Sequence, residues 1–148
     1  MADVTNKNLR LNGINQLTNF VEQNAYLLDF TEIGVTATGT HDLIDIPAGT
    51  AVVKLKLFAV EGVTSGGSAT LQFKVHDGNT ADNINSTALA IANLADGDVT
   101  EIVVNGTKGI VSEKGGKLQL AIGTAALTGG KVVMVVETIP ILKFLLNG

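Results

Sequence analysis

Two neighbouring stretches of the chain alternate apolar and polar residues with a period of two. In residues 51–62, "AVVKLKLFAVEG", Val53, Leu55 and Leu57 fall on one side while Lys54 and Lys56 fall on the other. The stretch "ATLQFKVH" repeats the pattern, with Leu71, Phe73 and Val75 inward and Gln72, Lys74 and His76 outward. A strand with one face on a core and the other toward solvent alternates in this way. Both stretches are therefore predicted to be half-buried β-strands.

From about Tyr26 to Pro140 the chain consists of short segments rich in β-branched residues, which are separated by Gly, Asn and Asp. Their spacing, near ten residues, is typical of all-β proteins. Short antiparallel strands of this length pack as two sheets, so we expect an antiparallel β-sandwich, jelly-roll-like, of about eight strands with an N-terminal arm. The other predicted strands are 26–38, 41–46, 86–92, 98–105, 109–112, 117–123 and 131–138, with turns at "TSGGS", "EKGGK" and "LTGG".

The ends of the chain differ from this central part. Residues 1–27 are rich in asparagine and are predicted to be an arm, in which Ile14, Leu17 and Val21 have the spacing of one short helix. Residues 28–138 are predicted to be the sandwich domain. The arm is a candidate contact segment.

The last ten residues, 139–148 ("IPILKFLLNG"), are too apolar for a free tail. We leave two interpretations open. The segment is either a last strand of its own sandwich or an anchor at an oligomer axis or on a neighbouring subunit, with Ile141, Phe144 and Leu145 as the contact candidates.

Composition narrows the classes of partner. Charged residues make up 16% of the 148 residues, against about 25% in an average soluble domain. The ten Lys and Arg are spread singly and the net charge is −4, which argues against nucleic acid and anionic membranes as partners. No apolar run approaches the roughly 18 residues of a membrane span, and the first residues lack the apolar region of a signal peptide. We therefore expect other protein subunits to cover part of the surface.

The candidates for chemistry are few. With no cysteine, the chain has no disulfide, thiolate ligand or cysteine nucleophile. Asp77, Asn79 and Asp82 offer oxygen ligands for a cation such as Ca²⁺, but Ala81 breaks the EF-hand alternation, and Asp-Gly with Asn is ordinary turn chemistry. We therefore predict no metal site and no cofactor.

Catalytic groups are equally sparse. His41 beside Asp42 is interpreted as a loop contact, and His76 as part of the outward face of its strand. No serine stands in a Gly-x-Ser-x-Gly turn, and the acidic pairs lie at predicted turns or strand ends, where carboxylates are solvated. We predict no catalytic residue and no enzymatic activity.

Residues 41–102 resemble the small β-sandwich virion proteins of tailed bacteriophages. The resemblance follows the order of the parts: "IPAGT" before an alternating strand, a Gly/Ser turn, "ATLQFKV" followed by "DG", then a small-residue segment and an acidic turn. Members of this group are capsid decoration (auxiliary or cement) proteins, head-fibre bases and tail-associated proteins. The resemblance implies a protein that is often trimeric and has no enzymatic activity.

The leading hypothesis is a bacteriophage structural protein, made in the host cytoplasm, that decorates the outer capsid surface of the virion and stabilises the head. Its expected partners are the major capsid protein and further copies of itself in a homotrimer, with both chain ends making contacts. One alternative is a head- or tail-fibre module for host attachment. An alternative of another class is a small hydrolase or Ca²⁺-dependent binding module that uses the Asp77 region.

Overall fold

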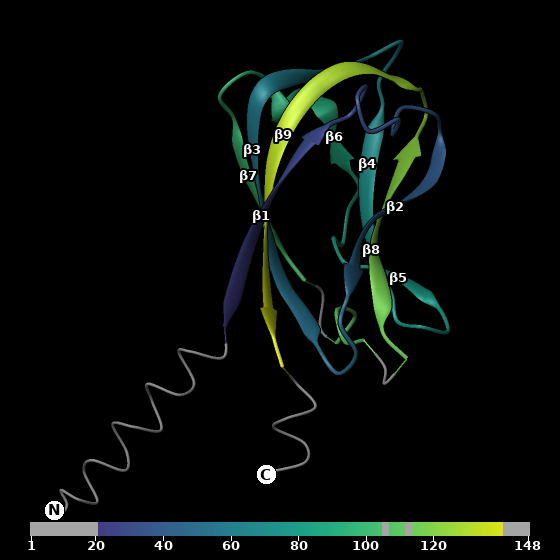
Figure 1. Cartoon of the computed structure of the whole chain (residues 1–148). Coiled ribbons are helices and arrows are strands. Elements are labelled where there is room, and N and C mark those ends of the chain that lie inside the picture. The colour runs from purple at the N-terminus through teal and green to yellow at the C-terminus, as the bar shows by residue number, and fades with distance from the viewer. Residues whose placement is uncertain (1–20, 105–106, 112–113, 141–148) are drawn as a thin grey trace, which may run out of the picture.

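The computed structural model describes residues 21–104, 107–111 and 114–140. In these residues two β-sheets stand as two layers (Figure 1), with one short 3-10 helix, which confirms the all-β antiparallel sandwich. The elements are β1 (Glu22–Asp29), β2 (Gly39–Ile46), β3 (Ala51–Ser65), β4 (Thr70–His76), β5 (Ala81–Asn83), β6 (Leu89–Ala90), η1 (Ile91–Leu94), β7 (Val99–Val103), β8 (Gly116–Gly123) and β9 (Leu127–Ile139).

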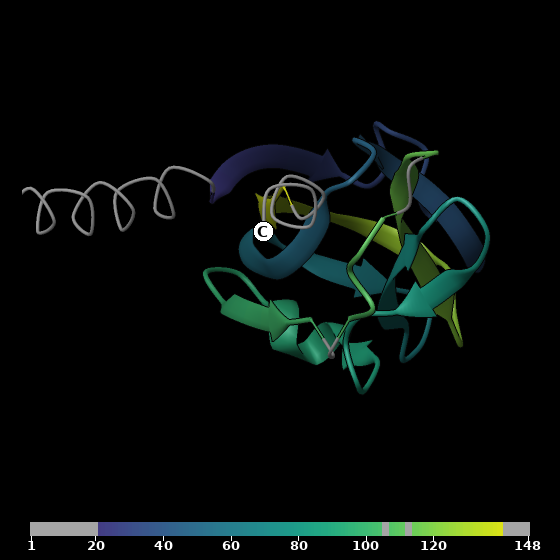
Figure 2. The ribbon, with the colours of Figure 1, turned by 90° about the horizontal axis from the view of Figure 1, so that it is seen from below.

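The strands form a first sheet of order β1-β9-β3-β7 and a second sheet of order β2-β8-β4-β5, in which β6 also pairs with β4. All of these pairings are antiparallel. Seen from below (Figure 2), β1 and β7 lie at opposite edges of the first sheet. The chain crosses from one sheet to the other at every step except those that link β4, β5 and β6.

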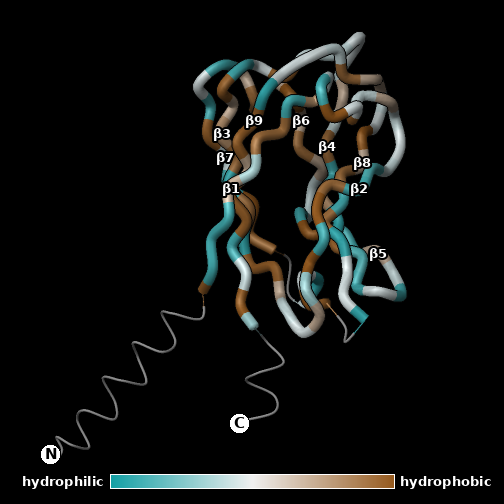
Figure 3. The backbone as a smooth tube through the Cα atoms, viewed as in Figure 1, coloured by the Kyte–Doolittle hydropathy of each residue, from teal (hydrophilic) through white to brown (hydrophobic). Residues whose placement is uncertain are grey.

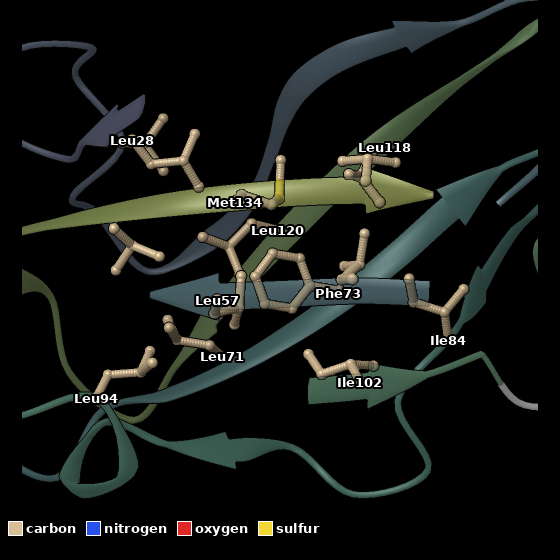
Figure 4. Packing of buried hydrophobic residues seen from close by; sticks show 14 of the residues in the cluster. Leu28, Leu57, Leu71, Phe73, Ile84, Leu94, Ile102, Leu118, Leu120 and Met134 are labelled. Atoms are coloured by element: carbon tan, nitrogen blue, oxygen red, sulfur yellow. The ribbon is translucent and has the colours of Figure 1, made fainter. Parts of the chain in front are cut away.

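The core lies between the two sheets and is filled from every second position of each strand. Leu55 and Leu57 of β3 and Leu71, Phe73 and Val75 of β4 are all at most 1% exposed, as the alternation predicts. The prediction is wrong for Val53, because an irregularity between Val52 and Lys54 turns Val52 into the core instead. Figure 4 shows these inner faces meeting around the Phe73 ring. Burying each of these side chains contributes about 1.5–3 kcal/mol. None of the helices in the described residues is long and apolar enough to span a membrane.

The strand expected over residues 26–38 is wrong at both ends. The structure has β1 over Glu22–Asp29, so residues 22–27, assigned to the arm, belong to the first sheet. A turn follows, because Gly34 adopts a φ of 77°, which L side chains rarely accept. The amide of Val35 donates to the carbonyl of Phe30 (2.9 Å), and both side chains are buried, which fixes the turn on the core.

The turn expected at "LTGG" is also wrong, since residues 127–130 begin β9. The chain instead turns over residues 123–127, where Thr124 has a φ of 72°. Gly129 and Gly130 lie where β9 passes the irregular end of β3, and the two strands curve over the top of the sandwich (Figure 1). A Cβ on Gly130 would lie 2.7 Å from the Cα of Val63, so this close approach requires glycine.

The remaining differences concern short elements. Residues 86–92 form only the two-residue β6 and the helix η1 rather than one strand. Residues 109–112 contribute an isolated bridge between Ile110 and Ala51. The last strand runs to Ile139, the first residue of the C-terminal segment for which two interpretations were left open.

One buried polar side chain joins the second sheet to the loop that follows β5. Asn85 is 7% exposed, and its Oδ1 accepts hydrogen bonds from the amide of Phe73 (2.9 Å) and from Nε2 of Gln72 (2.5 Å). Its Nδ2 donates to the carbonyl of Thr87 at 2.8 Å. Asn85 thus satisfies a buried amide of β4 that has no strand partner there.

We predict that Asn85→Ala lowers the free energy of unfolding by about 2 kcal/mol, because it leaves the amide of Phe73 buried without an acceptor. Urea unfolding followed by circular dichroism measures this change. The matched control is Asn83→Ala, at an exposed position of β5. Equal losses for the two variants would contradict the role given to Asn85.

Candidate docking surfaces

A line of apolar side chains crosses the outer face of the first sheet from edge to edge. Leu27 of β1 pairs with Val133 of β9, Val133 pairs with Phe58 of β3, and Phe58 pairs with Val99 of β7. Directly paired residues project from the same face of a sheet. We call Leu27, Val133, Phe58 and Val99 the apolar row.

The apolar row points away from the core. Leu28, Met134 and Leu57, each next to a member of the row, are buried, so the alternating strand directs the row outward. Leu27 is 59% exposed and Val99 is 53% exposed. Along the strands of both sheets apolar and polar positions alternate (Figure 3), but in this row the outward positions are apolar too.

Two further valines are exposed on this sheet. Val60, at the bulge of β3 beside the row, is 62% exposed. Val103, which is 68% exposed, is separated from the row because it pairs with Lys54 in the charged part of the face. Keeping apolar surface in water costs about 25 cal/mol per Å² relative to burial. Contiguous apolar patches on soluble proteins mark interaction sites more often than single exposed residues do. The outer face of the first sheet is therefore the main candidate docking surface.

Below the apolar row the charges neutralise one another within the sheet. Lys54 Nζ lies 3.6 Å from Glu101 Oε2 and 3.6 Å from Glu137 Oε2. Gln23 Nε2 also donates to Glu137 Oε2, at 3.2 Å. These groups span all four strands, so the lower part of the face presents both signs of charge and little net field.

Charges of both signs also lie beside and above the row. Lys56 Nζ lies 5.6 Å from the ring centroid of Phe58, a cation–π distance. Above the row, Lys131 Nζ lies 3.9 Å from Asp29 Oδ2, and Glu61 is paired in register with Lys131. The apolar row is thus bordered on both sides by charges of opposite sign.

The outer face of the second sheet is polar instead. Asp42 Oδ1 accepts a hydrogen bond from Gln119 Nε2 at 2.7 Å, and Lys117 Nζ donates to Asp45 Oδ1 at 2.7 Å. This bond to the Asp45 carboxylate raises the pKa of Lys117 above its ordinary value. The outer face of the first sheet thus carries an apolar row between charged groups, whereas the outer face of the second sheet is polar.

A groove of about 630 Å³ lies at the lower end of the polar face and includes Asp45, His76 and Lys117 in its lining. These groups already have partners within the chain. Asp45 and Lys117 pair with each other, and His76 Nδ1 accepts a hydrogen bond from the amide of Gly78 at 3.2 Å. The groove accordingly contains structural contacts rather than an arranged set of reacting groups.

The Asp77 region forms a closed turn. Asp77 Oδ1 accepts hydrogen bonds from the amides of Asn79 and Thr80, both at 2.8 Å, and the Asp77 amide donates to the Thr80 carbonyl at 2.9 Å. These bonds, that of Thr80 first, lower the pKa of the Asp77 carboxyl below its ordinary value. Asp82 lies elsewhere, 3.7 Å from Lys108 Nζ. Across the described residues no group of three or more His, Asp and Glu side chains is placed to hold a metal ion.

His41 and Asp42, which are neighbours in the sequence, form hydrogen bonds with different partners. His41 Nε2 donates to the carbonyl of Ala37 at 2.7 Å, whereas Asp42 bonds Gln119 on the outer face. Both residues lie in β2, and only His41 contacts the preceding loop, so the interpretation of the pair as a loop contact holds for His41 alone.

Most of the predicted contact residues lie outside the described residues: Ile14, Leu17, Ile141, Phe144 and Leu145. Val21, at the start of the described chain, is 43% exposed. A small apolar cleft of about 280 Å³ lies at the foot of the first sheet, lined in part by Val53, Val104 and Ile139. The contacts expected of the two ends stay predictions.

Sequence reasoning missed the apolar row. A signal was present, because residues 132–136 ("VVMVV") are apolar at every position, and a half-buried strand would be polar at every second one. Such a run predicts a strand that is covered on both faces. The pairing of Val133 with Leu27 and Phe58 depends on register, which a local pattern does not give.

No protein-family model matches the chain, and no curated protein matches it. Its fold is similar to chains in three solved structures. These are the capsid of Ralstonia phage GP4 (TM-score 0.58, 18% identity, 80% of this chain and 84% of that chain), the Cyanophage Pam1 capsid asymmetric unit (0.55, 19%, 80% and 84%) and the acidic stable capsid of Helicobacter pylori bacteriophage KHP30 (0.50, 17%, 81% and 88%). At these identities the likeness shows the fold.

We predict that Asp77→Ala lowers the melting temperature at pH 7 but has a much smaller effect at pH 2. The folded pKa of Asp77 is depressed, so its contribution is present above the ordinary value of 3.8 and is lost as the pH falls through the folded pKa. Thermal melts of the two proteins over this pH range measure the difference.

The control for this prediction is Glu32→Ala, at an exposed position in the turn after β1. Its effect should be small at both pH values. An Asp77→Ala effect that is as large at pH 2 as at pH 7 would contradict the proposed bonding. A calcium titration of the unaltered chain should leave the melting temperature unchanged, and a rise that Asp77→Ala abolishes would support the calcium alternative.

Proposed function

We propose that this chain is a structural protein of a tailed-bacteriophage virion, a capsid decoration or auxiliary protein that binds the outer surface of the head and stabilises it. The observation that carries the proposal is the exposed apolar face of a sandwich whose fold resembles chains in phage capsids. A fold built to display such a face fits an assembly component better than an isolated enzyme.

The share of each chain that is aligned supports this proposal. The alignments cover at least 80% of this chain and at least 84% of each neighbour, so the matched chains have about the same length as this one. The likeness thus extends over a whole small sandwich rather than one sheet of a larger protein. The strand order, with its repeated crossings between the sheets, supports the further proposal that the sandwich is a jelly roll.

The proposed mechanism is the addition of buried area across the boundaries between capsid subunits. A standard protein interface buries about 1,600 Å² in total. Repetition around a symmetric shell turns modest contacts into firm attachment, because each bound subunit raises the effective concentration of the next contact. A layer attached in this way opposes outward pressure on the shell.

The partners that follow are the major capsid protein and further copies of this chain. The resemblance implies a homotrimer, and the N-terminal arm and the apolar C-terminal segment are the proposed contacts with the shell. Synthesis in the host cytoplasm and a final place on the capsid surface belong to the same proposal. Catalysis has no part in it, because the polar groups of the groove are engaged in bonds within the chain.

We predict that removing residues 1–20 or residues 141–148 weakens attachment to capsids that lack this protein. Both deletions leave the nine strands of the described residues complete, since β1 begins at Glu22 and β9 ends at Ile139. Each truncated protein is mixed with undecorated capsids and sedimented, and the bound fraction is measured against the full chain. Circular dichroism checks that the sandwich is intact.

Full binding by both truncated proteins would contradict the assignment of the ends as anchors. Failure of the full chain to bind capsids would contradict the decoration role itself. Binding of the full chain to host cells but not to capsids would assign it to a fibre instead.

A further inference from the structure

We propose that the outer face of the first sheet packs against the same face of a second copy of this chain, across a twofold axis parallel to the strands and midway between β9 and β3. The contact would bury the apolar row and align its bordering charges with opposite charges on the other copy. The pairing concerns copies of this chain alone, so this proposal is independent of the proposal that the chain binds capsids.

Rotation about this twofold axis places the apolar row of one copy over the apolar row of the other. The rotation exchanges β9 with β3 and β1 with β7, which are placed symmetrically about the axis by the order β1-β9-β3-β7. Val133 then lies over Phe58 of the second copy, and Leu27 lies over Val99 of the second copy, because these residues share one line of register. Two sheets packed face to face lie about 10 Å apart, which suits side chains of this size.

Two charge pairs of the central strands match as well, whereas Lys56 of β3 comes over the apolar Val135 of the second copy. Glu61 of β3 is in register with Lys131 of β9, and Lys54 of β3 is in register with Glu137 of β9. Exchange of the two strands places Lys131 over Glu61 of the second copy and Glu137 over Lys54 of the second copy. Opposite charges therefore meet on both sides of the apolar row. Isologous contacts need this kind of self-complementarity.

The polar face of the second sheet does not offer the same fit. Its outward side chains, among them Asp42, Gln119 and Lys117, are hydrogen-bonded to neighbours within the sheet and present no apolar line. Covering them would remove polar groups from water without burying apolar area in return. The first sheet is therefore the face that gains from a partner.

The size of the face sets the strength of the contact. Four strands about 4.8 Å apart, over about six residues at 3.4 Å each, give a flat face of roughly 400 Å² per copy. A standard interface buries about 800 Å² per partner, so the pair should be weak in solution and depend on protein concentration. Copies held side by side on a shell would pair far more completely.

The inference also bears on subunit number. A contact of this kind joins copies two at a time, so it forms a dimer, or a hexamer if a threefold contact also exists. Both assemblies contain an even number of chains, unlike the lone trimer that the resemblance implies. The mass of the assembly in solution therefore tests the inference.

The decisive experiment uses two variants that each repel themselves. Lys131→Glu places a carboxylate over Glu61 of the second copy, and Glu61→Lys places an ammonium over Lys131 of the second copy. Each variant alone should dimerise about tenfold more weakly than the unaltered chain, as both contacts change from attraction to repulsion. When the two variants are mixed, opposite charges meet again in both contacts, and dimerisation should recover.

Sedimentation velocity over micromolar to millimolar concentrations measures the dimer for each protein and for the mixture. The like-charge pair within each altered chain, and the lost contact of Lys131 with Asp29, persist in the mixture, so they cannot produce the recovery. Lys74→Glu, an outward position of the second sheet, is the matched control and should dimerise like the unaltered chain.

The proposal would be overturned by an unaltered chain that stays monomeric throughout the range, by a lone trimer, or by variants whose mixture dimerises no better than either alone. If the two variants bind capsids poorly while their self-association is unchanged, the face belongs to the capsid contact instead. Loss of capsid binding by the full chain would leave a positive mixing result intact, so the two proposals fail separately.

Discussion

The pairing of β3 with β9 is the constraint on which the rest of the first sheet depends. These are the longest strands of the described chain, and each of the other strands of that sheet pairs with one of them. Their register sets Phe58 beside Val133, and β7 and β1 then add Val99 and Leu27 to the same line. The charges that border this line are placed by the same register, so a shift of one strand by one residue would turn that strand's outward side chains toward the core.

The first sheet carries apolar side chains on both faces, and the fold buries only those of the inner face. Inward residues such as Met134 and Leu57 fill the core, which contributes most of the stability of a small sandwich. The outward row adds nothing to that core and costs solubility. In a chain with only 16% charged residues, this exposed apolar surface supports the proposed interface between two copies of the chain. The polar face of the second sheet then remains in contact with solvent.

Local pattern was sufficient where one face of a strand is polar. The period of two in β3 and β4 predicted the buried positions of Leu55 and Phe73, because each of those side chains faces the core between polar neighbours. Local pattern predicted the wrong element where contacts between distant segments determine the structure. Residues 22–25 are part of β1 because β9 offers them a partner, and position 130 of β9 requires glycine because β3 approaches it too closely for a side chain. The docking face depends on register between distant segments, which no short window contains.

The central claim is that the outer face of the first sheet is covered in the assembled particle while the outer face of the second sheet is not. Hydroxyl-radical labelling, read by mass spectrometry, measures this directly by comparing isolated protein at low concentration with particles that carry it. The account predicts that labelling of Leu27 and Phe58 falls strongly in the particles while labelling of His76 changes little. Equal labelling of Leu27 and Phe58 in both states, or protection confined to His76, would contradict it.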